Sequence, residues 1–325
     1  MDRRKFIKVG SAAVAATAVS ANGIVNAAES LGGKKLKAHN PSGSVVWSSE
    51  TGKAGEGDLF ARFLGTGAAD WNGPDERGEH RRLTSILLDN RIFIDFTETD
   101  ADMLPKDFKS DAVFYTHSHG DHYNAAAEIK YIGASHVYVG ATWVERARKE
   151  FKKAAEKAGA ECPEVTPLGI GTKVIVGDIT ITAMPGNHYI DAEEQALIYL
   201  IEKGDVRVVY ATDTGGIVVR AARIAGIDAH DPNGKPITAL VMEATMGIDY
   251  DEDYRIFAHS SVGLVKRTTD VLLSTGRLAA PEGQPVYLTH MARGLHGTQA
   301  ELDRDLPQPL RAAYDGLEVI FRPAR

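Results

Sequence analysis

The sequence predicts a layered α/β fold with a metal site beyond the ends of its strands. The chain has 325 residues, 43% hydrophobic and 25% charged, which suffices for one large α/β domain or two small ones. Short apolar runs typical of buried strands recur along it, some of them separated by helical patterns. Several of these runs end just before a histidine or a carboxylate, and in layered α/β sheets functional sites gather beyond strand ends.

The individual elements follow from the spacing of apolar residues and from turn signals. Strands are expected over 59–64, 84–88, 91–95, 112–115, 136–139, 174–176, 179–184, 196–201, 206–211, 240–242 and 286–289. Helices are expected over 123–132 and 142–157, and a short loop is expected to complete the segment 142–167. Asp89-Asn90 and Gly177-Asp178 are each typical of a hairpin turn.

The densest set of metal-ligating side chains is His117-Ser118-His119-Gly120-Asp121-His122, directly after an apolar strand. Three imidazoles and a carboxylate within six positions are common ligands of divalent metals, and no apolar core requires them. Alternate side chains of an extended loop point the same way, so His117 and His119 can share one metal. Asp121 and His122 follow the turn and can face a second metal. Asp121 is also expected near the start of the next helix, where a carboxylate is favoured.

Other potential ligands come after apolar strands in the same way, namely His188, Asp213, Glu243 and His290. With His117, this placement occurs five times, which favours one shared site over independent surface residues. His296 competes with His290 for the last position. Asp95 ends a strand ahead of the metal loop, and it either orients a ligand from behind or lies in a solvated loop.

Residues 1–28 resemble a twin-arginine signal peptide. Arg3-Arg4 is followed, after one residue, by Phe6-Ile7-Lys8, then by an Ala-rich segment and a cleavage-type site at 25–28. A transmembrane anchor is the alternative, but polar residues interrupt the segment. We therefore expect export by the twin-arginine machinery, a periplasmic or otherwise exported protein, and no stable membrane anchor. Residues 29–57 are expected to form a linker or peripheral extension before one domain over 58–325.

Composition and charge exclude some classes of partner and site. Cys162 is the only cysteine, which excludes an intrachain disulfide and a cysteine-based zinc site. Residues 1–28 carry +3 of the net charge of −7, which leaves −10 on the remainder. Such an acidic body matches long nucleic acid poorly, because binding to phosphates requires positive charge. A small-molecule substrate is therefore expected.

The motif 117–122, followed by His188, Asp213 and His290, resembles the metallo-β-lactamase superfamily over about residues 58–325. The resemblance implies a four-layer αβ/βα sandwich with a dinuclear site in the cleft. It implies that one metal is held by His117, His119 and His188, and the other by Asp121, His122 and His290, with Asp213 bridging them. The implied cofactors are two divalent ions, with Zn2+ favoured over Mn2+ and Fe2+. A homodimer is common among the proteins that it resembles.

The segments Glu243-Ala244-Thr245, Ala258-His259-Ser260-Ser261 and Leu288-Thr289-His290 are similar to those of the tRNase Z and cyclic-phosphodiesterase branch. This similarity implies that His259, supported by Glu243, contacts the scissile phosphate or protonates the leaving oxygen. It further implies that Asp121 orients a hydroxide shared by the metals. A helix-capping or core histidine is the alternative for His259. Processing of tRNA is not expected, because 142–167 leaves no room for the long tRNA-binding arm.

The expected function is a phosphodiesterase acting on a small, cyclic or nucleotide-like phosphodiester. Hydrolysis of a lactone, ester, β-lactam or sulfate ester at the same site is the alternative activity. The non-enzymatic alternative is a metal-binding scaffold protein without activity. Arg81, Arg82 and Arg255 could bind anionic substrate groups, although solvation on the surface is the default expectation for each.

Overall fold

The structure is a computed structural model that describes residues 54–191 and 193–324. The predicted signal peptide over 1–28 and most of the predicted linker over 29–57 lie outside the described residues. Among the described residues, no helix has both the length and the apolar composition needed to cross a bilayer.

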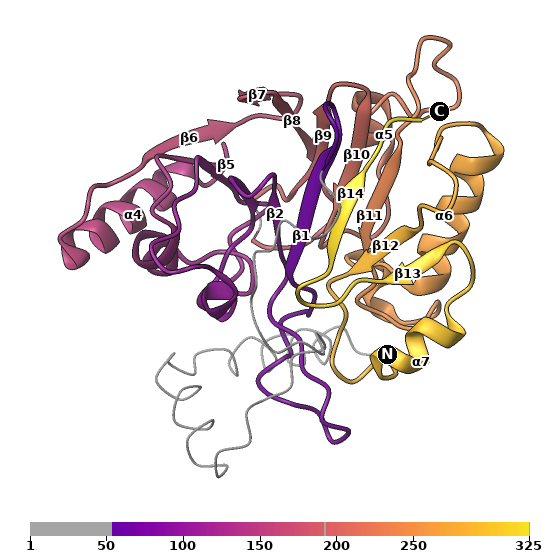
Figure 1. The fold of residues 1–325 in the computed structure, drawn as a ribbon, viewed down its shortest axis with the longest axis horizontal. Helices are drawn as coiled ribbons and strands as arrows, with labels where there is room; N and C mark the ends of the chain where they lie inside the picture. The colour runs from indigo at the N-terminus through magenta and orange to yellow at the C-terminus, as the bar shows by residue number, and fades with distance from the viewer. Residues whose placement is uncertain (1–53, 192, 325) are drawn as a thin grey trace, which may run out of the picture. The chain divides into compact units, whose positions relative to one another are not determined.

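Two seven-stranded mixed sheets form the centre of the fold (Figure 1). The first has the order β14-β1-β2-β3-β4-β5-β6 and the second the order β13-β12-β11-β10-β9-β8-β7. The strands of the first are β1 Leu59–Gly65, β2 Ser85–Leu88, β3 Ile92–Ile94, β4 Ala112–Phe114, β5 His136–Gly140, β6 Glu164–Leu168 and β14 Glu318–Phe321. Those of the second are β7 Lys173–Val176, β8 Ile179–Pro185, β9 Leu197–Lys203, β10 Val206–Ala211, β11 Ala239–Glu243, β12 Val286–Thr289 and β13 Leu310–Ala312.

Each sheet joins a parallel part to an antiparallel part. Strands β3 to β6 pair in parallel, and so do β10 to β13. The remaining pairs are antiparallel, including the predicted hairpins β2–β3 and β7–β8. The loops that follow the parallel strands β4, β10, β11 and β12 carry most of the predicted site residues.

Helices cover the outer faces of both sheets, as seen for α4 beside β5 and for α6 beside β11 and β12 in Figure 1. The helices are α3 Ala125–Ala127, α4 Val144–Ala158, α5 Val219–Ile224, α6 Val262–Ser274 and α7 Gln299–Asp305, with shorter 3-10 or π turns at η1 Glu98–Met103, η2 Glu128–Ile132 and η3 Tyr254–Phe257. Helix α4 buries Val144, Ala147, Phe151 and Ala155, a spacing of three to four residues that places them on one face.

Three apolar clusters define the layers. One lies between the sheets and joins Phe63 of β1 to Tyr199 of β9. The second lies between the second sheet and its helices, and the third between the first sheet and α4. Within β10, Val208 and Tyr210 face the cluster between the sheets whereas Val209 faces the helices, which is the period of two expected of a strand buried on both sides. The predicted layered α/β sandwich is thus confirmed.

Several local predictions need correction. The segment 142–167 was expected to end in a loop, but it contains most of β6, an edge strand. Asp121 does not lie at the start of a helix, because α3 begins four residues later and Asn124 caps it by accepting from the N–H groups of Ala126 and Ala127. Strands β13 and β14 and helices α5, α6 and α7 were not predicted.

Candidate metal centre

The predicted metal loop follows β4 and turns back on itself before α3. The backbone N–H groups of His122 and Tyr123 both donate to the carbonyl of His119, at 3.0 and 2.9 Å. This turn separates the first two histidines of the motif from Asp121 and His122. The loop therefore presents these side chains as two pairs, His117 with His119 and Asp121 with His122.

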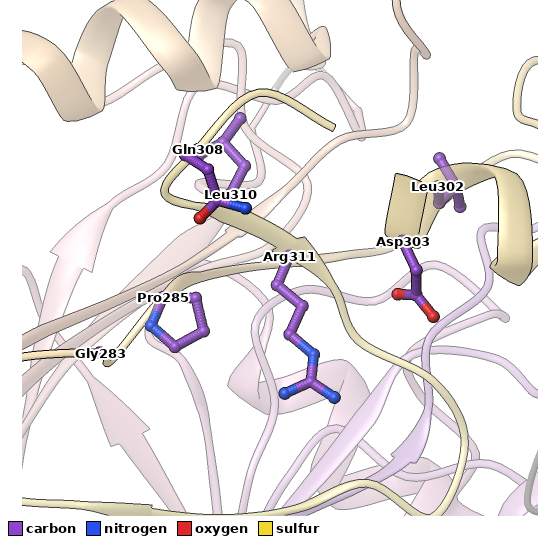
Figure 2. A pocket seen from close by; sticks show the side chains of 7 residues that line it. All are labelled: Gly283, Pro285, Leu302, Asp303, Gln308, Leu310 and Arg311. Atoms are coloured by element: carbon purple, nitrogen blue, oxygen red, sulfur yellow. The ribbon is translucent and has the colours of Figure 1, made fainter. Parts of the chain in front are cut away.

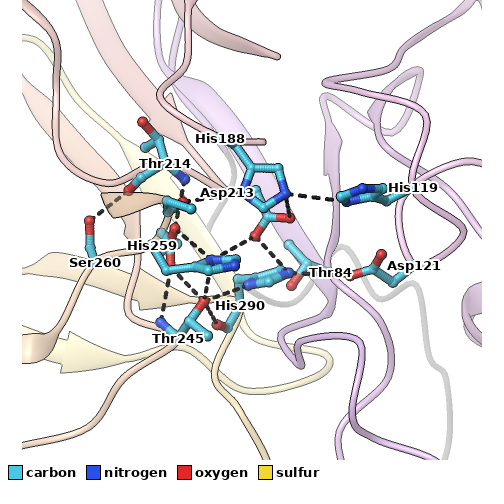
Figure 3. A network of polar contacts seen from close by, with 12 residues as sticks. Thr84, His119, Asp121, His188, Asp213, Thr214, Thr245, His259, Ser260 and His290 are labelled. Carbon is cyan, nitrogen blue, oxygen red and sulfur yellow. Dashed lines mark hydrogen bonds and ion pairs between the residues drawn. The ribbon is translucent and has the colours of Figure 1, made fainter. Parts of the chain in front are cut away.

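The first donor group consists of His117, His119, His188 and Asp213. His119 Nδ1 lies 3.0 Å from His117 Nε2 and 3.2 Å from His188 Nε2. Asp213 Oδ2 lies 3.3 Å from His117 Nε2 and 3.5 Å from His188 Nε2. Figure 3 shows His119 facing His188 and Asp213 across the site. Four donor atoms thus converge on one point.

The second donor group consists of Asp121, His122, Asp213 and His290. His290 Nε2 lies 3.2 Å from His122 Nε2 and 3.4 Å from Asp121 Oδ2. Asp213 reaches this group too, with Oδ2 3.2 Å from His122 Nε2 and Oδ1 3.0 Å from His290 Nε2. Asp213 is therefore the carboxylate that both groups share.

This arrangement fits divalent metal ions better than it fits a hydrogen-bonded polar cluster. Imidazole nitrogens and carboxylate oxygens are the ligands that zinc and related ions prefer. Asp213 Oδ1 is buried, and ring nitrogens of His290 and His259 lie 3.0 and 3.5 Å from it. Each donor group brings histidine nitrogens and carboxylate oxygens within 4.8 Å of one another, which is a set of ligand atoms that such an ion would accept.

In three histidines of the donor groups, the ring nitrogen that faces away from the cluster contacts another residue. His122 Nδ1–H donates to Asp95 Oδ2 at 2.7 Å, and His188 Nδ1–H faces the carbonyl of Ala258 at 3.2 Å. His290 Nδ1 lies 2.9 Å from the hydroxyl of Thr245. Such contacts fix the ring orientation and leave the other nitrogen free for a metal. Asp95 thus takes the ligand-orienting position, rather than that of a solvated carboxylate.

The structure places His259 and Glu243 beside the donor groups. Glu243 is buried and accepts from the N–H groups of Thr214 and Thr245 at 2.6 and 3.0 Å. His259 Nδ1 lies 3.2 Å from Glu243 Oε1 and 3.5 Å from Asp213 Oδ1. The imidazole is therefore part of the site and not a remote core histidine (Figure 3).

The charges around the histidines give them different protonation states. Burial is the largest influence on His117 and lowers its pKa to about 3, so this ring is neutral at pH 7. Burial also lowers the pKa of His290, but Asp213 and Asp121 outweigh it and raise that pKa to about 9. Glu243 and Asp213 likewise outweigh burial at His259 and raise its pKa to about 11. Without bound metal, His259 is therefore a cation at neutral pH.

Three residues of the site have left-handed backbone conformations that non-glycine residues seldom adopt. The φ angles are 58° at Asp95, 44° at Asp213 and 53° at His290. Each such residue costs of order 1–3 kcal/mol, and the surrounding contacts must compensate for it. At His290, the carbonyl accepts from Thr245 Oγ1, and the next residue, Met291, donates its N–H to the carbonyl of Thr66. Sequence patterns carried no signal for this strain.

Two further predicted features have clear outcomes. His296 is in neither donor group, and its Nε2 lies 2.7 Å from the carbonyl of Ala244, whereas His290 is in the second group. Arg81 is not solvated as expected: it is buried, and its guanidinium donates to Thr66 Oγ1 and Gln299 Oε1 at 2.7 Å each. Arg82 pairs with Asp102, and Arg255 with Asp253.

Sequence reasoning assigned no role to Thr116 and Thr245. Thr116 donates its N–H and hydroxyl to Asp95, and its hydroxyl lies 3.0 Å from His117 Nδ1. Thr245 connects Glu243, His259 and His290 through one hydroxyl. Threonines are frequent after strands in any protein, so only their position directly beside predicted ligands could have pointed to them.

A pocket elsewhere in the chain shares no residue with this cluster. Figure 2 shows its lining, which comes from β13, α7 and loops beside them: Gly283, Pro285, Leu302, Asp303, Gln308, Leu310 and Arg311. It contains no convergent set of metal-ligating side chains. We therefore place the candidate chemistry at the His/Asp cluster.

Comparison with known proteins agrees with this fold. Residues 93–240 match a family described as the β-lactamase superfamily domain, a span that includes both ligand pairs of the loop, His188 and Asp213. No curated protein matches the chain. The chain therefore has the layered metallo-β-lactamase fold, with a His/Asp cluster that could bind metal ions.

Solved structures with the same fold share little sequence with the chain. A diphosphatase of the PhnP family has 18% identity and a TM-score of 0.57, over 82% of this chain and 99% of that one. Zn2+-bound PqqB from Methylobacterium extorquens has 14% identity and a TM-score of 0.55, over 80% and 99%. Human tRNase Z, short form, has 15% identity and a TM-score of 0.55, over 81% and 99%.

Proposed function

We propose that this chain, which carries a β-lactamase superfamily domain over residues 93–240, is a metal-dependent hydrolase that cleaves a small phosphodiester. The observation that carries the proposal is the position of His259. Its ring is held by Glu243 and lies within 3.5 Å of the carboxylate that both donor groups share. A cationic imidazole at this point can protonate a leaving oxygen during ester cleavage.

The two donor groups would hold two divalent ions, with zinc as the proposed metal. His117, His119 and His188 would hold one, Asp121, His122 and His290 the other, and Asp213 both. Bound there, such ions would polarise a phosphoryl oxygen and acidify a water molecule. Neutral imidazoles and carboxylates are the ligands that zinc requires, and the rear contacts of His122, His188 and His290 direct their free nitrogens inward.

The side chains would then perform separate tasks. Histidine contacts, His122 foremost, outweigh burial at Asp121 and hold its pKa well below the usual range, so it stays a carboxylate. Asp121 can therefore accept a hydrogen bond from the attacking water and orient it. His259 would donate its proton to the leaving oxygen, and Glu243 would stabilise the cation before transfer. Hydrogen-bonding groups that are already in position before the reaction lower its activation barrier, because they need not reorganise as charge develops.

A phosphodiester is the first substrate class to test. Two proteins that share the fold, the diphosphatase and the tRNase Z, cleave bonds to phosphorus. The same donor groups could serve a carbonyl or sulfate ester, so the test must compare these classes. Zinc-loaded protein should be assayed with bis(4-nitrophenyl) phosphate, a lactone, a chromogenic cephalosporin and an aryl sulfate. The proposal expects the phosphodiester to be turned over fastest, and turnover confined to the other substrates would contradict it.

We also propose that the protein is exported through the twin-arginine machinery, acts in the periplasm on a small molecule rather than on long nucleic acid, and has no stable membrane anchor. The motif Arg3-Arg4-Lys5-Phe6 supports this proposal. Replacing both arginines by lysine should retain the protein in the cytoplasm, and N-terminal sequencing of exported protein should begin near residue 29. Unchanged export of the double-lysine variant would contradict the proposal. A homodimer is the proposed assembly, to be tested by sedimentation.

A further inference from the structure

The carboxylate of Glu194 binds the metal loop at a position between two of its ligands. Ser118 donates its backbone N–H to Glu194 Oε1 at 2.8 Å and its hydroxyl to Oε2 at 2.6 Å. Ser118 is the single residue that separates His117 from His119. Both carboxylate oxygens are thus engaged by one residue, which fixes the position and the orientation of the loop at this point.

Glu194 also belongs to the loop that carries His188. That loop runs from the end of β8 to the start of β9, and its base is closed by Gly186 and Ala196, whose N–H and carbonyl lie 2.8 Å apart. Within this loop, the backbone N–H of Glu194 donates to Asp191 Oδ1 at 2.9 Å. The carboxylate therefore joins the two loops that supply the three histidines of the first donor group.

The contact is buried and balanced in charge. The side chain of Glu194 is 2% exposed, and Arg146 of α4 places Nη2 3.1 Å from its Oε2. A buried carboxylate is costly unless it is paired and hydrogen-bonded, and here both conditions are met. The neighbouring Glu193 carries the same side chain but is exposed. Burial of a charge at this position needs a reason, and the contact with Ser118 supplies it.

We propose that Glu194 is a positioning residue for the first donor group: it holds Ser118, and through it His117 and His119, at the distance from His188 that a metal ion requires. The inference rests on the metal centre of the proposed function. It does not depend on which ester the protein cleaves. Partners that orient metal ligands from outside the coordination sphere typically change metal affinity by about 10- to 100-fold when they are removed.

The test compares Glu194→Gln, Ser118→Ala and the matched control Glu193→Gln in the full chain. Zinc affinity is measured by competition with a fluorescent chelator, and Co2+ absorption spectra report the ligand geometry. Glu194→Gln should weaken zinc binding by about 10- to 100-fold and alter the cobalt spectrum. Ser118→Ala should have a smaller effect, because its N–H remains. Glu193→Gln should bind zinc as the natural protein does.

A double variant separates positioning from a general role in folding. Because Glu194→Gln and Ser118→Ala disturb the same contact, their combined effect on zinc affinity should be smaller than the sum of the two. The thermal unfolding of the metal-free proteins is recorded in parallel. Equal zinc affinity in Glu194→Gln and Glu193→Gln would overturn the inference, as would additive effects of the two substitutions.

Failure of the inference and failure of the proposed function have different signatures. Zinc affinity that falls in Glu194→Gln, with no hydrolysis of any ester by the natural protein, would support Glu194 as a positioning residue and contradict the hydrolase. Hydrolysis by the natural protein together with unchanged zinc affinity and cobalt spectrum in Glu194→Gln would support the hydrolase and overturn the role of Glu194.

Discussion

Asp95 Oδ2 lies 2.7 Å from His122 Nδ1, and both side chains are fully buried. The same carboxylate accepts the N–H and the hydroxyl of Thr116, which lies just after β4 and directly before His117. Asp95, at the end of β3, therefore contacts the metal loop at two points. Burial raises the pKa of Asp95, opposed by His122 and by the hydrogen bonds from Thr116. The pair therefore sets the direction in which His122 Nε2 points.

Replacement of Asp95 by asparagine should weaken metal binding while leaving the protein folded. An amide cannot accept from all three donors, so one of them loses its partner, at a cost of about 1–3 kcal/mol in unfolding free energy. Zinc affinity should fall by about 10- to 100-fold. Chelator competition and thermal unfolding measure the two effects. Asp102→Asn, at an exposed partner of Arg82, is the control and should change neither by a comparable amount.

Most side chains of the two donor groups stand out in the sequence because they lie at short spacings or at strand ends. The motif 117–122 can be recognised directly from its residue types and spacing. His188, Asp213 and His290 each follow an apolar run. The rear contacts could not be predicted, because the Thr245 hydroxyl reaches His290 across 45 positions of the chain. Strand β6 was missed because it contains Pro167, which is tolerated there since β6 lies at the sheet edge.

The left-handed conformations of Asp95, Asp213 and His290 could not be predicted for a related reason. A sequence pattern reports the preference of each residue, and here tertiary contacts override that preference. The fold class was accessible from apolar patterning and from the family resemblance. The orientation of the side chains in the donor groups depends instead on contacts between residues far apart in the chain.

Substitution of Asp213 should affect both metal equivalents, whereas substitution of His290 should affect one. Asp213 supplies oxygens to both donor groups, whereas His290 belongs only to the second of these two. Asp213→Asn should therefore reduce bound zinc from two equivalents to one or fewer, and His290→Ala should reduce it to one. Elemental analysis after dialysis measures this. Two equivalents retained by Asp213→Asn would show that the aspartate is not shared.

His259→Gln should slow hydrolysis of the phosphodiester by about 10²–10⁴-fold, because the variant lacks the proton donor. The zinc content should stay the same, with the exposed His230→Gln as the control. Loss of zinc would instead identify His259 as a ligand, since its Nδ1 also lies within reach of Asp213.

The pH dependence provides a second readout for His259. A raised pKa of about 11 means that the imidazole is protonated at neutral pH and loses its proton only in strong base. Activity that depends on this proton should fall as the pH rises through that range, and the fall should be absent in His259→Gln. A natural protein whose activity keeps rising with pH at the alkaline limit would contradict the role of His259 as the donor.

The two donor groups should take up zinc with different proton release. His117, with a pKa of about 3, is already neutral at pH 7, so zinc displaces no proton from it. His290, with a pKa of about 9, is protonated at pH 7, so zinc must displace a proton from it. The affinity of the second group for zinc should therefore rise about tenfold per pH unit for each proton displaced, up to about pH 9. Calorimetry at pH 7 in two buffers of different ionisation enthalpy measures this release. It should accompany the second zinc equivalent and diminish in His290→Ala. Heat independent of the buffer for both equivalents would show that the metal-free site does not hold these protons.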